Sequence, residues 1–407
     1  PAPLFSRGSP LASHVFHMLC SEEMSPRVIL FIGNFFSSLF AALIGYILLP
    51  YLSTFMPMVY TGLVIAGGAL VALILFPFLP TLVRRFGAQR LALVFAIIEM
   101  ITLFALAAAP GAVTASILIA LAVALQPLLY YELDLLLEAT VAEEETTGRV
   151  RTLFITMWNI AALAAPLLLG ALLADSDAYG RVFLAAGAAL VPFIVLFAVR
   201  RLPQGAPVEL SHMRDTLRCI SRDPDLAAVT FGHFLLYAFF IWASFYTPAY
   251  LHMVLGIPWS DLGWIFALML VPYALLEYPA GWVADKFIGD KELMFVGFLI
   301  AGAALASISL LTSTSSLFLI LCILILSRTG AALVESSTEG HFFRRVTERD
   351  VNSVSVFRGV WPLANLIAPI IGSIILFFGN YQLLFLLTGG FIAIVGATTT
   401  LLIRDFR

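Results

Sequence analysis

The sequence predicts an all-α, polytopic membrane protein made of two six-helix bundles related by a pseudo-two-fold axis. Three observations lead to this prediction: an extremely hydrophobic composition, twelve apolar segments of spanning length, and an internal repeat. Of the 407 residues, 61% are hydrophobic and only 12% are charged, and the mean hydropathy is +1.01. A water-soluble chain of this length needs a larger polar surface, so we expect lipid to surround most of it.

The composition also excludes several classes of protein. The only lysines are Lys286 and Lys291, and neither lies in a Walker-type phosphate loop, so the chain is not expected to use ATP directly. Cys20, Cys219 and Cys322 are isolated and odd in number, which indicates neither a disulfide framework nor a metal site. The net charge of −3 says nothing about nucleic acid, but the chain has no basic tail, and no nucleic-acid partner is expected. No cofactor is expected either.

The chain contains twelve apolar segments that are long enough to cross a bilayer as helices. They lie near residues 28–53, 59–79, 91–109, 112–137, 150–174, 182–199, 226–251, 262–283, 293–311, 317–337, 351–377 and 383–403. The predicted domains are a cytoplasmic N-terminal segment over 1–27, a first bundle over 28–199, a cytoplasmic linker over 200–225, and a second bundle with a short tail over 226–407.

The basic residues predict the orientation of the helices. Nearly all of the 22 Lys and Arg residues fall in the termini and the even-numbered connections, for instance Arg84, Arg200 and Arg344. Because cytoplasmic loops carry an excess of basic residues, both termini are expected in the cytoplasm. The short outer loops and the absence of an N-x-[ST] sequon fit a bacterial inner membrane.

The two halves of the sequence repeat with a shift of about 200 residues. The matching segments are Gly33-Asn34-Phe35 with Gly232-His233-Phe234, Asp134-x-x-x-Glu138 with Glu335-x-x-x-Glu339, and Trp158-x-x-Ala161-x-x-x-Ala165-Pro166 with Trp361-x-x-Ala364-x-x-x-Ala368-Pro369. A fourth match pairs the loop that follows helix 2 with the loop that follows helix 8. Four matches at nearly one shift, each in the corresponding helix, indicate two halves of the same architecture.

The loop after helix 8 resembles the signature of the major facilitator superfamily, with one residue inserted before its second glycine. The residues that carry the resemblance are Gly281, Asp285, Lys286, Gly289 and Lys291. Its first-half counterpart keeps Leu82, Arg85, Gly87 and Arg90 but has Pro80 for the glycine and Arg84 for the aspartate. The resemblance covers nearly all of 28–403 and implies a twelve-helix secondary transporter that works by alternating access.

The resemblance also implies a cytoplasmic gate, because each signature loop of the family meets the start of a helix in the opposite half. We therefore expect Asp285 beside Arg149 and Arg151 at the start of helix 5. On the altered side we expect Arg84 to pair with Glu348 or Asp350, and Arg358 to pair with Glu335 within the second half. The residues expected at the gate are Arg84, Arg85, Arg90, Arg149, Arg151, Gly281, Asp285, Lys286, Asp350 and Arg358.

Polar residues inside the spans are the candidates for substrate and proton binding, since ionisable groups are costly in a bilayer. In the family, helices 1, 4, 7 and 10 line the central cavity, and the candidates there are Asn34, Gln126, Tyr130, Asp134, His233, Arg328 and Glu335. Helical rise puts four of them at roughly 10–13 Å from the cytoplasmic ends. Interhelical hydrogen bonding is the alternative role, and it is at least as well supported for Asn34 and Gln126. Tryptophans in the spans could stack on a substrate or simply pack.

The sequence therefore predicts a secondary active transporter of a small solute, with protons as the coupling ion and the titrating group among Asp134, His233 and Glu335. Arg328 should favour an anionic or carboxylate-bearing solute unless Glu99 or Glu132 neutralises it. A drug/proton efflux antiporter is one alternative, because the run from Ala161 to Gly170 is similar to the antiporter motif. A transporter-like receptor or scaffold is another. No nucleophile–base–metal spacing appears, so no enzyme is expected. We expect a monomer.

Overall fold

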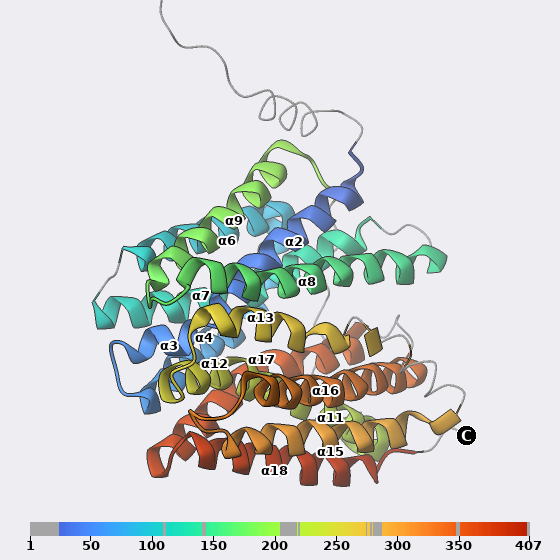
Figure 1. Cartoon of the computed structure of the whole chain (residues 1–407). Coiled ribbons are helices and arrows are strands. Elements are labelled where there is room, and N and C mark those ends of the chain that lie inside the picture. Colours follow the sequence, from blue (N-terminus) through green and yellow to red (C-terminus); the bar gives the residue numbers. More distant parts are fainter. Residues whose placement is uncertain are drawn as a thin grey trace, which may run out of the picture.

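In the computed structural model, the elements of the described part of the chain are helices (Figure 1). The structure describes residues 24–108, 111–140, 144–203, 218, 220–273, 275–276, 279, 287–346 and 351–404, without the side chains of 144–149, 151–152, 351–352 and 354–355. Within these ranges, eleven helices are long and apolar enough to cross a membrane. They correspond to eleven of the twelve predicted spans.

The described residues of the first half form nine elements. They are α2 (Pro26–Gly45), α3 (Leu48–Ser53), α4 (Met58–Leu75), η1 (Phe76–Phe78), α5 (Leu79–Phe86), α6 (Ala88–Ala107), α7 (Ala112–Glu138), α8 (Glu144–Leu173) and α9 (Tyr179–Val199). The second half comprises α11 (Pro224–Ile241), η2 (Trp242–Tyr246), α12 (Thr247–Ala249), η3 (Tyr250–Val254), α13 (Trp259–Met269), α15 (Asp290–Ser307), η5 (Ile308–Leu310), α16 (Leu317–Arg345), α17 (Val351–Phe378) and α18 (Tyr381–Thr400).

Three spans differ from their predicted form. The first is divided between α2 and α3. The second is longer than predicted and reaches Phe86 through η1 and α5. Pro77 and Pro80 interrupt the helical hydrogen bonding at η1, because proline has no backbone N–H to donate. The seventh contains two π-helical turns, η2 and η3, which flank Pro248. Such turns widen a helix and commonly mark functional positions. Only the first part of the eighth predicted span is a described helix, α13.

Two glycines of the signature loops take the same backbone conformation in both halves. Gly87 has φ +82° and precedes α6, while Gly289 has φ +97° and precedes α15. A residue with a side chain rarely adopts such φ values, so a glycine is favoured at both turns. The internal repeat thus extends to the backbone of the two loops.

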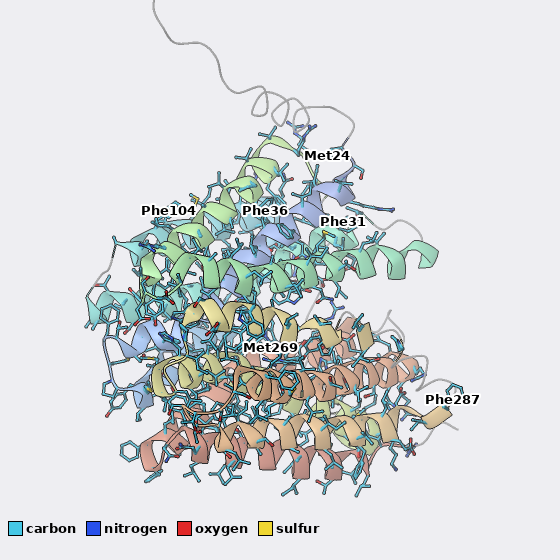
Figure 2. All side chains as sticks on the ribbon, viewed as in Figure 1. Met24, Phe31, Phe36, Phe104, Met269 and Phe287 are labelled. Atoms are coloured by element: carbon cyan, nitrogen blue, oxygen red, sulfur yellow. The ribbon has the colours of Figure 1, made fainter. Side chains whose placement is uncertain are left out.

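Apolar side chains cover the outside of the bundle as well as the space between the helices (Figure 2). Leu310, Phe378 and Ile394, for example, are 78%, 80% and 67% exposed. A surface of this kind is stable only against lipid, which agrees with the membrane class predicted from composition.

The halves meet through α8 against α13 and α4 against α17 (Figure 1). At the first contact the backbones nearly touch, since a Cβ atom built on Gly263 would lie 2.8 Å from Gly170 Cα. The Ser260 amide also donates to the Ala174 carbonyl over 3.1 Å. These contacts lie at one end of the molecule, which we call the contact end. The other end carries Arg84 and Arg344, and we call it the arginine-rich end.

Candidate functional site

A small pocket lies between the two halves, with a cavity volume of about 20 Å³, which is room for about one water molecule. Its lining residues come from α2, α7, α8 and α17 and are Ser37, Phe40, Ala41, Gln126, Leu129, Tyr130, Trp158 and Trp361. Gln126 and Tyr130 are predicted cavity residues, and the structure brings them together here. They lie four residues apart on α7, so the helical period puts both on one face.

The two tryptophans of the pocket are equivalent positions of the internal repeat. Trp158 comes from α8 of the first half and Trp361 from α17 of the second. The ring of Tyr130 lies 6.3 Å from that of Trp361 at 72°, an edge-to-face contact across the two halves. The pocket is therefore bounded by corresponding parts of both halves.

An ion pair joins the halves one helical turn from the pocket. Arg358 Nη1 donates to Asp134 Oδ2 over 2.8 Å, and both side chains are partly exposed. The expected pairing of Arg358 with Glu335 inside the second half is therefore corrected. The reason is register: Arg358 precedes Trp361 by three residues, so it shares the face of α17 that is turned toward α7. Asp134 and Arg358 both lie toward the arginine-rich end of their helices.

His233 belongs to a cluster on the second-half side of the site. It is 2% exposed, its ring stacks on Phe357 at 4.0 Å, and its Nδ1 lies 3.2 Å from Thr338 Oγ1. The Thr338 hydroxyl itself donates to the Glu335 carbonyl. Because that uses the hydroxyl hydrogen, Nδ1 is the donor to Thr338 and carries a proton.

Tyr237 connects this cluster with Glu335 and with the pocket, and the sequence interpretation missed it. Its ring contacts the His233 ring edge-on at 4.8 Å. The hydroxyl lies within electrostatic range of Glu335, Glu339 and Tyr130. The available signal was its spacing of four residues from His233, which puts both on one face of α11.

Asn34 does not line the pocket. It is fully buried, donates from Nδ2 to the Phe154 carbonyl over 2.7 Å, and accepts from the Ser38 hydroxyl. The amide thus holds α2 against α8, and its assignment to the cavity was wrong. The alternative role in interhelical hydrogen bonding fits this geometry.

Arg328 does not line the pocket either. It is 2% exposed, and Nη2 donates to the Ala243 carbonyl and to Ser244 Oγ at 3.3 Å each. The guanidinium also lies over the Phe239 ring at 5.6 Å. All these partners belong to its own half, which removes the basis for expecting Arg328 to select an anionic solute.

Neither candidate for neutralising Arg328 does so. Glu99 and Glu132 are fully buried, and no oxygen of either carboxylate has a hydrogen-bond partner among the described residues. An ionised carboxylate in such surroundings would be very costly, so the neutral acid is the form that fits.

The predicted gate residues are only partly described. Arg84, Arg85 and Arg90 are exposed at the arginine-rich end, and the Arg85 guanidinium lies over the Phe86 ring at 5.3 Å. The other gate contacts stay predictions, because the residues concerned lie outside the described residues or lack a described side chain: Gly281, Asp285, Lys286, Glu348, Asp350, Arg149 and Arg151.

At the contact end, polar bonds that the sequence interpretation missed also join the halves. His252 Nε2 lies 2.8 Å from Asp177 Oδ1, while Nδ1 lies 2.8 Å from the Ile257 carbonyl. Ser260 donates to Asp175 over 3.3 Å. Both ring nitrogens of His252 therefore face an oxygen, one from its own half and one from the first half.

Comparison with known proteins now decides the family. The sequence profile of the Major Facilitator Superfamily matches residues 30–337 and 255–405. This chain belongs to the major facilitator superfamily. No curated protein matches the sequence closely enough to be significant.

Solved structures show the same fold. The nucleoside transporter NupG superposes with a TM-score of 0.73 at 12% identity, covering 93% of this chain and 100% of that one. A bacterial homolog of the human lysosomal transporter Spinster, in an inward-facing and occupied conformation, gives 0.73 at 14% identity over 97% of both chains. The peptide transporter POT in complex with alafosfalin gives 0.74 at 14% identity, over 92% and 93%. The protein is therefore an all-α, multi-pass membrane protein of the major facilitator fold.

Proposed function

We propose that this protein is a secondary active transporter that carries a small solute through the pocket between its halves by alternating access. The observation that carries the proposal is the position of the pocket. Repeat-related residues of both halves line it, and separate groups of contacts between the halves lie on either side of it. Rocking of one half against the other would exchange these two groups of contacts.

Proton coupling follows from the ion pair beside the pocket. A proton that binds to the Asp134 carboxylate removes its negative charge, so the bond to Arg358 weakens and the arginine-rich end can open further. Return of the proton to water restores the pair. The His233–Tyr237–Glu335 cluster offers further protonatable groups near the same axis.

The positive-inside rule supports a cytoplasmic arginine-rich end with both termini on that side, in a bacterial inner membrane. The contact end is then the outer end, and the structure resembles an inward-facing state. For the efflux-antiporter alternative, the run from Ala161 to Gly170 has an interpretation in packing, because Gly170 faces Gly263 across the halves.

Proteoliposomes with purified protein test the proposal. They would be given a defined mixture of neutral, anionic and cationic solutes, with and without a pH gradient, and the contents analysed by mass spectrometry. We expect at least one solute to accumulate only with the gradient. The matched control is Asp134→Asn, which should lose accumulation but keep exchange. A protein that moves no solute under either condition would be a receptor or scaffold instead.

A further inference from the structure

We propose that the first half binds an anionic phospholipid at its arginine-rich end. The guanidinium groups of Arg85, Arg90 and Arg201 hold the phosphate, and the acyl chains lie along α6 and α9. We call these three residues the arginine cluster. Three features support a lipid site here: the position of the cluster, its charge, and the apolar surface next to it. Lipid binding of this kind goes beyond the proposed function and does not depend on transport.

The side-chain amide of Gln89 ties the chain that follows α9 to the start of α6. Its Nε2 donates to the Arg200 carbonyl, and its Oε1 accepts from the Leu202 amide over 3.0 Å. Arg201 lies between the two residues that Gln89 binds, while Arg90 directly follows Gln89 in the chain. The side chains of Arg90 and Arg201 therefore start from neighbouring points of the backbone, although they lie far apart in the sequence.

Arg85 joins this pair from the last turn of α5. Gly87, with φ +82°, turns the chain between α5 and α6, so Arg85 lies at the same end of the molecule as Arg90. The Arg85 guanidinium lies over the ring of Phe86 at 5.3 Å, and that ring is 44% exposed. Exposed aromatic and basic side chains at the end of a span are typical of the level at which phospholipid headgroups lie.

The protein does not neutralise the charge of the cluster. Among the described residues, none of the three arginines forms an ion pair. At the same end of the second half, by contrast, Arg344 binds Asp290 and Arg345 binds Asp223. Guanidinium groups without a carboxylate partner at headgroup level attract anionic lipids. A phosphate group also suits them, because its oxygens match the planar fork of N–H donors.

An apolar surface extends from the cluster toward the middle of the membrane. On α6, Val94, Ile97 and Ile101 are 48%, 39% and 58% exposed, and their spacing puts them on one face with Arg90. On α9, which packs against α6, Val199 is 64% exposed. A lipid whose phosphate binds the cluster can therefore lay its acyl chains against both helices. The apolar faces accept any lipid, whereas the arginines select an anionic headgroup. This arrangement favours a phospholipid over a soluble anion.

Lipid binding to the full-length protein in detergent tests the inference. The purified protein would be titrated with phosphatidylglycerol or with phosphatidylcholine of the same acyl chains, and native mass spectrometry would count the bound lipids. We expect phosphatidylglycerol to bind at least about tenfold more tightly, because each arginine near the headgroup favours an anionic lipid by about fivefold. Inorganic phosphate at the same concentration should not displace it.

Variants then locate the site. Arg90→Gln and Arg201→Gln should each weaken phosphatidylglycerol binding about fivefold and leave phosphatidylcholine binding unchanged. Arg90→Lys and Arg201→Lys keep the charge and should lose less. Gln89→Leu, which releases Arg201 from its place beside α6, should weaken phosphatidylglycerol binding about as much as Arg201→Gln. The control is Arg404→Gln, which removes one exposed charge from the same end of the second half and should change nothing.

Equal binding of the two lipids to the unaltered protein would overturn the inference, and this comparison needs no variant to fold. An equal loss in Arg404→Gln and Arg90→Gln would overturn it too, because the arginines would then act only through the general charge of that end. Displacement by inorganic phosphate would assign the cluster to a soluble anion instead. The transport proposal fails separately: selective lipid binding without any flux contradicts transport alone, while flux without lipid selectivity contradicts the lipid site alone.

Discussion

Asp134 of α7 and Arg358 of α17 form an ion pair that joins the two halves, with 2.8 Å between Oδ2 and Nη1. One turn away on the same two helices, Tyr130 and Trp361 form an aromatic contact between the halves. The pair therefore stands between the pocket and the arginine-rich end. A partly exposed pair of this kind contributes only about 0.2–1 kcal/mol. It can bias two conformations that differ by a few kcal/mol without locking either.

Neutralising Asp134 should uncouple transport without unfolding the protein. In Asp134→Asn the amide cannot lose or gain the coupling proton, so gradient-driven accumulation should fall at least about tenfold while exchange continues. The unfolding temperature should change little, because the pair is weak. The double variant Asp134→Arg with Arg358→Asp should restore the ion pair between the halves but not the proton coupling, because the carboxylate now lies on the other helix. Normal accumulation in Asp134→Asn would refute the role of this carboxylate.

His252 and Asp177 should hold the contact end closed. Asp177→Asn replaces the carboxylate that lies 2.8 Å from His252 Nε2 with a neutral amide, so this bond between the halves should weaken and the contact end should open more often. In a background without Cys20, Cys219 and Cys322, labelling of Ser260→Cys by a maleimide should become several-fold faster. Asp261→Asn, an acid at the same end, is the control. Identical labelling rates in the two variants would count against a closing role for Asp177.

The glycine contact between α8 and α13 should be needed for closure. A Cβ at position 263 would lie 2.8 Å from both Gly170 Cα and the Pro166 carbonyl oxygen, so Gly263→Leu must push the helices apart. We expect a shift toward the state that is open at the contact end, with uptake reduced at least about tenfold. Gly390→Ala is the control, because nothing lies within 4 Å of its added Cβ. Unaltered uptake in Gly263→Leu would show that the halves do not need this close approach.

Arg328 should stabilise the second half rather than select the solute. Its guanidinium bonds η2 and is almost completely buried, so Arg328→Gln should lower the unfolding temperature by several degrees. The relative uptake of an anionic and a neutral solute in proteoliposomes should stay the same. A selective loss of uptake of the anionic solute at an unchanged unfolding temperature would instead restore the anionic-solute hypothesis.

His341 should also stabilise the second half. Its Nε2 lies 3.1 Å from Asp225 Oδ1 and its Nδ1 lies 3.6 Å from Asp290 Oδ2, while Arg344 and Arg345 bind the same two acids. His341→Leu leaves buried carboxylate oxygens short of a partner, and we expect a loss of about 1–3 kcal/mol of stability. Thermal unfolding in detergent measures it, and an unfolding temperature equal to that of the wild type would contradict this account.

The helices and the equivalence of the two halves could be predicted from the sequence, because they depend on composition and on the internal repeat. Hydropathy predicts twelve spans, and eleven of them are found as long apolar helices among the described residues. The equivalence of Trp158 with Trp361 follows from the repeat, but the repeat did not predict that both line one pocket. Partners across the interface could not be predicted in the same way. Whether Arg358 binds Glu335 or Asp134 depends on the rotation of α17 against α7. Asn34 and Arg328 are polar residues in cavity helices whose side chains turn into their own half. The bond between His252 and Asp177 joins the end of η3 to the connection between α8 and α9, two places that carry no repeat signal.

Alternating access is the central claim, and distance measurements at both ends test it most directly. Spin labels at Val199→Cys and Leu402→Cys report on the arginine-rich end, while labels at Val113→Cys and Phe378→Cys report on the contact end. All four positions are at least 64% exposed. Double electron–electron resonance in nanodiscs should show two populations of distances for each pair of labels. A change from high to low pH should lengthen the distances at one end and shorten them at the other. The substitution Gly263→Leu should also change the two ends in opposite directions. A single distance at each end that neither pH nor Gly263→Leu alters would contradict the account.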